Sequence, residues 1–102
     1  MSVSTIQNLD EKMLIIKVKG NFDFSVQQEF RLAYENNQSI AKYRIDLSET
    51  QHIDSAGLGI LMAMRSSLGL EDRKIEICKC NPDVLQLLDI FRLGKYFNIV
   101  SV

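Results

Sequence analysis

The sequence predicts a single α/β domain built on a mixed, mostly parallel sheet of four to five strands with helices packed against it. Runs rich in β-branched residues alternate along the chain with segments whose apolar residues recur at helical spacing, as in β-α-β units. The 102 residues, 46% of them hydrophobic, suffice for one core, and no repeat or linker divides them. We therefore expect residues 1–102 to form one domain in the order β-β-α-β-α-β-α, with a short helix or strand at the C-terminus.

The first third of the chain predicts a strand pair followed by a helix. Residues 3–8 and 13–18 are rich in β-branched residues and flank a short polar segment, so we expect a hairpin. Ser25 and Gln28 match a capping box, which predicts that a helix begins there. Its apolar spacing extends to about residues 36–37.

The middle of the chain predicts a strand, a loop and a second helix. Residues 43–47 alternate between apolar and charged side chains, which is typical of a strand. From about Ala56 to Leu68 the apolar residues, among them Leu58 and Leu61, fall on one side of a helix. Ser55 lies in the loop directly before this helix.

The last third predicts a strand, a capped helix and a final strand. Residues 74–78 form the strand pattern. Residues 81–83, Asn-Pro-Asp, supply an N-cap, a proline at the first helical position and an acid in the first turn of a helix that runs to about Phe91. A turn at residues 94–96 leads to a predicted last strand at 97–100.

The composition argues against several classes of partner. With 12 basic and 13 acidic residues the net charge is -1, so no positive field attracts nucleic acid or an anionic membrane. The N-terminus lacks the apolar core of a signal peptide, and no apolar run approaches the roughly 20 residues that span a bilayer. Cys78 and Cys80 would point the same way from one strand and could not easily form a disulfide, so we expect a cytoplasmic protein.

Three patterns that resemble catalytic or ligand sites are incomplete. His52, Asp54 and Ser55 are the residue types of a hydrolase triad, but they are nearly contiguous, and Ile53 stands where a nucleophile elbow needs glycine. Two cysteines and one histidine are too few for a tetrahedral zinc site. The segment 57–59, Gly-Leu-Gly, lacks the Gly-Lys-Ser/Thr ending of a P-loop. We expect no enzymatic activity, no metal and no cofactor.

The segment 54–59, Asp-Ser-Ala-Gly-Leu-Gly, is the most specific stretch of the chain. Together with Asp-Leu-Ser at 46–48, Asn-Pro at 81–82 and Leu-Gly-Lys-Tyr-Phe at 93–97, it resembles the STAS domain of bacterial anti-sigma factor antagonists. The resemblance covers nearly the whole chain. It implies that a partner, both anti-sigma factor and serine kinase, phosphorylates Ser55.

The resemblance also implies a cycle of partner switching. The unphosphorylated form would bind the anti-sigma factor and release the sigma factor, and a metal-dependent serine phosphatase would reset the phosphorylated form. Asp23 and Asp54 match the family's acidic positions. Ala56 departs from the pattern, since many relatives have a second serine there.

The second predicted helix has a face of mostly small side chains that carries Ser55. Small residues let another backbone approach closely, so this face is a predicted docking surface, although Gly59 and Ala63 would equally let the first helix pack tightly. The predicted partner-binding residues are Asp23, Asp54, Ser55, Ala56, Gly57, Gly59, Met62, Ala63 and Ser66.

Two alternatives to this switch stay open. Ser55 could serve only as the N-cap of the second helix. The domain could also be a constitutive subunit of a transport or signalling complex, in which the same helix docks without phosphorylation.

Overall fold

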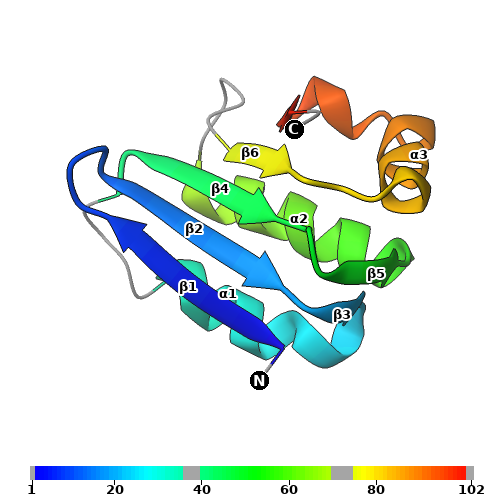
Figure 1. The fold of residues 1–102 in the computed structure, drawn as a ribbon, viewed down its shortest axis with the longest axis horizontal. Coiled ribbons are helices and arrows are strands. Elements are labelled where there is room, and N and C mark those ends of the chain that lie inside the picture. Colours follow the sequence, from blue (N-terminus) through cyan, green and yellow to red (C-terminus); the bar gives the residue numbers. More distant parts are fainter. Residues whose placement is uncertain (1, 36–39, 70–74, 101–102) are drawn as a thin grey trace.

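A computed structural model of the chain describes residues 2–35, 40–69 and 75–100. The main sheet has five strands in the order β1-β2-β4-β6-β7 (Figure 1). β1 (Val3–Asn8) is antiparallel to β2 (Met13–Val18), and β4 (Lys42–Asp46), β6 (Ile75–Cys78) and β7 (Asn98–Val100) follow in parallel. The predicted mixed, mostly parallel sheet and the N-terminal hairpin are confirmed.

The helices lie on one face and at one end of this sheet. α1 (Gln27–Glu35) follows the short 3₁₀ turn η1 (Phe24–Val26), and α1 and α2 (Ser55–Leu68) lie behind the sheet in the view of Figure 1. α3 (Pro82–Ile90) and η2 (Leu93–Lys95) lie at the end where β6 and β7 pair. No helix in the described part of the chain is long and apolar enough to cross a membrane.

The core fills the space between the sheet and helices α1 and α2. Leu14, Ile16 and Ile45 point from alternate strand positions toward the helices and are buried. Phe22 and Phe30 meet inside this layer with ring centroids 5.3 Å apart. Burial of such side chains supplies most of the driving force for the fold.

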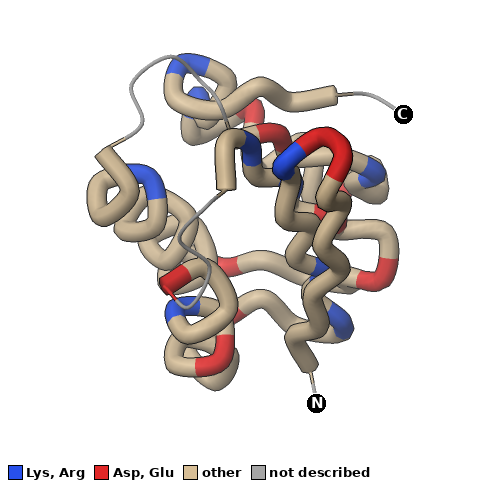
Figure 2. Tube along the Cα trace, turned by 90° about the vertical axis from the view of Figure 1, so that its left-hand side faces the viewer, with Lys and Arg blue, Asp and Glu red and all other residues tan. Residues whose placement is uncertain are grey.

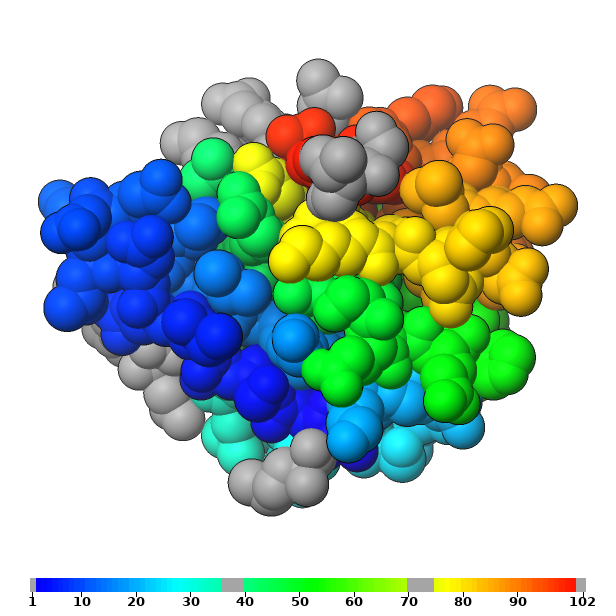
Figure 3. All heavy atoms as spheres, viewed as in Figure 1, coloured from blue at the N-terminus to red at the C-terminus, as the bar shows by residue number. Residues whose placement is uncertain are grey.

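The opposite face of the sheet carries paired charges instead of a helix. Figure 3 shows this face of the sheet, and Figure 2 shows charges of both signs along the strands. Glu76 accepts a hydrogen bond from Nε of Arg44 at 2.8 Å and lies 3.2 Å from Nζ of Lys42. Burial of the Glu76 carboxylate opposes ionisation, but these hydrogen bonds outweigh it and hold its pKa below the usual value.

A second, two-stranded sheet was not predicted from the sequence. β3 (Gly20–Phe22) and β5 (Thr50–Ile53) pair in parallel beyond the ends of β2 and β4. Thr50 donates a hydrogen bond from Oγ1 to the carbonyl of Val18 at 2.7 Å, which fastens this small sheet to the large one. It positions the start of α2.

The predicted capping box at the first helix is wrong. Asp23, and not Ser25, caps this segment, because its side chain accepts from the backbone N–H of Ser25 at 2.9 Å. Ser25 lies inside the 3₁₀ turn, and α1 begins only at Gln27. The predicted end at residues 36–37 lies outside the described residues.

The other predicted elements are confirmed to within one or two residues. The third strand covers 42–46 rather than 43–47, and the second helix begins at Ser55 rather than Ala56. Asn81 caps α3 with Pro82 in its first turn, as predicted. The last strand is shorter than 97–100, and Lys74 lies outside the described residues.

Candidate functional site: the exposed start of helix α2

Ser55 is the first residue of α2 and is exposed to solvent. The residue before it, Asp54, is the N-cap, and its Oδ1 accepts from the backbone N–H of Gly57 at 2.9 Å. The alternative in which Ser55 is the N-cap is therefore wrong. Among the described residues the Ser55 hydroxyl has no hydrogen-bond partner, so it remains open to a second protein.

The parallel pairing of β3 with β5 brings two acidic residues to one edge. Phe22 pairs with Ile53, and the next residues are Asp23 and Asp54. Both line a hollow of about 230 Å³, which His52 also borders as an exposed side chain. Two predicted site residues from distant parts of the sequence thus line one hollow, and Ser55 follows Asp54 directly in the chain.

Asp23 remains ionised in this arrangement. The side-chain hydroxyl of Ser25 and its backbone N–H both donate to the Asp23 carboxylate, and these hydrogen bonds lower its pKa. The position before η1 therefore carries a fixed negative charge. Any further negative charge on Ser55 would add to an acidic surrounding.

Gly57 has a packing role and does not belong to the exposed face. A Cβ on Gly57 would collide with the backbone carbonyl oxygen of Phe22 and lie 2.7 Å from Cγ1 of Ile53. Only glycine lets the first turn of α2 approach β3 and β5 this closely. Of the predicted partner-binding residues, this one is covered by the protein itself.

The remaining predicted residues follow α2 along an open face. Ser55, Gly59, Ala63 and Ser66 are exposed, whereas Ala56 and Met62 are half-buried. A Cβ added to Gly59 would meet nothing within 4 Å. The alternative in which Gly59 lets the first helix pack tightly is therefore wrong.

A groove runs between α1 and α2 along this face. Its volume is about 280 Å³. It is lined by Phe24, Gln27, Arg31, Tyr34, Ala56, Gly59, Ile60 and Ala63. The wall formed by η1 and α1 was not predicted from the sequence. One signal for it was Phe24, a large apolar residue that falls outside the helical spacing of the core residues and is exposed.

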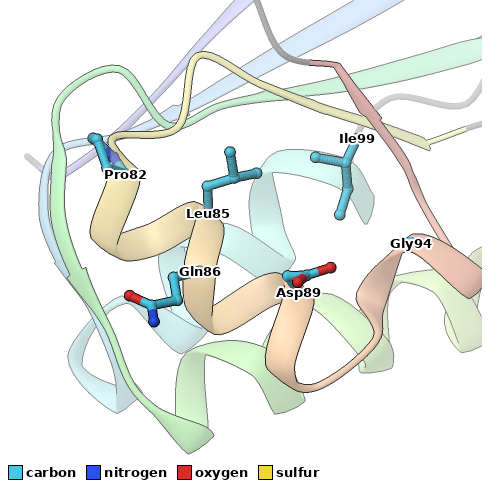
Figure 4. A pocket seen from close by; sticks show the side chains of 6 residues that line it. All are labelled: Pro82, Leu85, Gln86, Asp89, Gly94 and Ile99. Carbon is cyan, nitrogen blue, oxygen red and sulfur yellow. The ribbon is translucent and has the colours of Figure 1, made fainter.

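A second hollow, of about 560 Å³, lies between α3 and β7 and contains none of the predicted site residues. Leu85 and Ile99 face each other across it in Figure 4, with Asp89 and Gly94 at its lower side. Its surface is mostly apolar, although Gln86 and Asp89 also line it. It is separate from the groove beside Ser55.

The cysteines differ from the arrangement predicted for them. Cys78 ends β6 and is buried, whereas Cys80 follows the strand, beyond Lys79 at a φ of 60°. Both thiols are free, and burial raises the pKa of Cys80 to about 11. In the described part of the chain no three His, Cys, Asp or Glu side chains cluster as metal ligands would.

The chain is similar to several known proteins. Residues 3–102 match the STAS domain family. A STAS-domain containing protein of Pseudomonas aeruginosa is 33% identical over 97% of this chain and 99% of its own length. An anti-sigma F factor antagonist of Paenibacillus polymyxa is 24% identical over 85% of this chain and 77% of its own length.

Solved structures share the fold at low sequence identity. An anti-sigma factor antagonist from Mycobacterium paratuberculosis superposes with a TM-score of 0.74 and 21% identity, covering 99% of this chain and 87% of that protein. Bacillus SpoIIAA in its phosphorylated form gives a TM-score of 0.60 at 12% identity, covering 97% and 91%.

Proposed function

The chain belongs to the STAS domain family, and we propose that within it the protein is an anti-sigma factor antagonist switched by phosphorylation of Ser55. The observation that carries this proposal is the exposed Ser55 hydroxyl at the first position of α2, beside an open helix face. Related sequences and structural neighbours that are anti-sigma factor antagonists support it.

In the proposed cycle, the protein binds and is not an enzyme. Unphosphorylated, it binds an anti-sigma factor that is also a serine kinase, and the sigma factor is released. Once the kinase has phosphorylated Ser55, the complex separates, and a serine phosphatase restores the binding form. The cycle takes place in the cytoplasm and requires neither nucleic acid nor a membrane as a direct partner.

Phosphorylation at this position should leave the fold intact. A phosphate adds about -1.5 to -2 charges and three acceptor oxygens. At the amino end of α2 the helix dipole favours a negative charge by about 0.3–1 kcal/mol. The exposed hydroxyl takes no part in capping, so no native hydrogen bond is lost.

The same phosphate should disrupt a protein–protein contact. A partner packed over the neutral hydroxyl would have to desolvate the new charge, which directly follows Asp54 and the hollow that Asp54 shares with Asp23. A cost of about 3 kcal/mol weakens binding by about a hundredfold. Phosphorylation therefore blocks docking without remodelling the domain.

The proposal is tested by comparing three forms of the protein as ligands of one partner. Ser55→Ala, which cannot be phosphorylated, serves as bait in the native host, and the recovered partner is purified. Ser55→Ala should bind it like the unphosphorylated wild type, and Ser55→Asp at least about tenfold more weakly. Ser4→Asp, on the exposed β1, is the matched control for the added charge and should bind normally.

Equal affinity of the three Ser55 forms would rule out the switch. Intact mass of the protein from the native host, with and without phosphatase treatment, gives an independent readout. A phosphate on Ser55 supports the switch. Its absence under every growth condition supports the constitutive subunit instead.

A further inference from the structure

The groove between α1 and α2 begins beside Ser55. Ala56 lines its near end, and Gly59 and Ala63 continue it about one and two turns further along α2. Residues of η1 and α1 form the opposite wall. A partner segment that covers the Ser55 hydroxyl and lies along α2 therefore passes over this groove.

We propose that the groove selects the partner by taking one of its apolar side chains, with a carboxylate of the partner placed next to Arg31. This inference rests on the proposed function, because it assigns a chemistry to the same binding face. It concerns which protein is bound, whereas Ser55 governs when it is bound.

The depth of the groove depends on Gly59. Glycine within an exposed helix costs about 1 kcal/mol relative to alanine, so it needs a reason. Gly57 has one in its contact with Phe22, but nothing in the protein lies within 4 Å of a Cβ on Gly59. The space that the missing side chain leaves open faces outward and is available to another molecule.

The wall of the groove offers the side chains that commonly anchor protein interfaces. Phe24 is 69% exposed, although it lies beside a largely apolar lining. Tyr34 and Ile60 complete this part of the lining. Aromatic residues next to a small pocket are frequent hot spots, because a partner that fills the pocket also removes the ring from water.

Arg31 determines the charge that the partner should carry. Its Nε lies 3.8 Å from the Glu35 carboxylate, and both side chains are about half exposed. Exposed pairs of this kind contribute little, about 0.3–0.5 kcal/mol, so a carboxylate of the partner can compete for Arg31. An arginine at the edge of an apolar groove favours an acidic residue adjacent to the inserted side chain.

The size of the groove points to a protein segment. Its volume of about 280 Å³ lies just below the range of about 300–1,000 Å³ typical of small-molecule pockets. One or two side chains such as leucine, methionine or phenylalanine are a better match. The occupant is therefore a segment of the anti-sigma factor that carries one such residue next to Asp or Glu.

A library of random short peptides displayed on phage tests this inference without knowledge of the natural partner. The wild type should enrich peptides that carry a large apolar residue beside Asp or Glu. Gly59→Leu, which fills the groove, should bind those peptides at least about tenfold more weakly, and Arg31→Glu should lose the preference for acidic residues. Gly94→Leu is the matched control, since a Cβ there is equally unobstructed but lies outside the groove.

Folding of the variants is checked by thermal unfolding. Gly59→Leu should melt at or above the wild-type temperature, because leucine is the better helix former and its Cβ meets no neighbour. Phe24→Ala removes one wall at an exposed position and gives a second variant that should lose the peptides. No enrichment on the wild type, or equal affinity of Gly59→Leu for the selected peptides, would overturn the proposal.

The outcomes separate this inference from the switch. The peptide measurements involve neither a phosphate nor a change at Ser55. If these peptide measurements fail, the groove is not a peptide-binding site, but the proposed switch at Ser55 is unaffected. If Ser55→Asp binds the partner as tightly as the wild type does, the switch is rejected, but the groove can still be a binding site.

Discussion

At the residue scale, the two glycines of the segment 54–59 serve different purposes. Gly57 is buried against Phe22 and Ile53, whereas Gly59 is exposed and opens a groove. They are only two positions apart, but successive helix positions point in different directions. The same residue type therefore marks a packing contact at one position and a surface feature at the other.

The two positions should respond oppositely to alanine. Gly57→Ala should destabilise the domain by about 1–3 kcal/mol, because the new methyl group collides with the Phe22 carbonyl oxygen. Gly59→Ala should stabilise it by up to about 1 kcal/mol through helix propensity. Urea unfolding of both variants measures the difference. A loss of stability in both would contradict the assignment of Gly59 as unobstructed.

The position of Ser55 was predictable from the sequence, but the groove beside it was not. The position of Ser55 at a strand-to-helix junction follows from the motif and the helical spacing after it. Asp54 caps the helix because an N-cap residue has an extended backbone, and the ψ of Asp54 is -173°. The motif alone does not show at which residue the extended backbone ends and the helix begins. The contribution of Phe24 to the groove depends on how η1 and α1 pack against α2, and no local sequence pattern encodes this packing.

At the scale of elements, the small sheet of β3 and β5 was the main omission. Each strand has only three or four residues, too few for a clear alternating pattern. Their pairing joins segments about thirty residues apart in the sequence, so it depends on the tertiary fold and not on a local pattern. Its effect is large, since it brings Asp23 next to Asp54.

The start of α3 is tied to this small sheet through Asn81. Its Oδ1 accepts from the N–H of Val84 at 2.8 Å, and its Nδ2 donates to the carbonyl of Thr50 at 3.0 Å. Asn81→Ala should cost about 2 kcal/mol, and Asn81→Ser, which keeps the cap, about 1 kcal/mol. Chemical denaturation checks this order, with the exposed Asn98→Ala as a control expected to change little. An unchanged stability of Asn81→Ser would mean that the bridge to β5 contributes nothing, and equal losses for Ala and Ser would mean that the cap contributes nothing.

At the scale of the whole molecule, the sheet has one face against helices and one face of paired charges. Parallel strands usually need cover on both faces. Here Lys42 and Arg44 on β4 occupy outward positions, and both form ion pairs with the carboxylate of Glu76 on the neighbouring β6. The alternation of apolar and charged side chains in 43–47 was predictable from the sequence. The ion-pair partners on the neighbouring strand were not, because they depend on the register of β4 and β6.

This network should make the domain sensitive to acid. The pKa of Glu76 is lowered in the folded protein, so its contribution to stability is present above the unfolded value of about 4.3 and is lost as the pH falls toward the folded value. Urea unfolding between neutral and acidic pH should show a decline that is shallower in Glu76→Gln. Glu49→Gln, in a more exposed pair with Lys17, should keep the wild-type slope. An unchanged slope in Glu76→Gln would exclude the network as the cause.

The order of the main sheet, β1-β2-β4-β6-β7, also repeats the order of its strands along the chain. Each new strand joins the open edge left by the one before it, and none must be inserted between two strands already paired. The N-terminal hairpin can therefore act as a template on which the emerging chain adds one unit at a time during synthesis. The short β7 (Asn98–Val100) closes this series at the opposite edge, so assembly of the sheet finishes only after these residues have been synthesised.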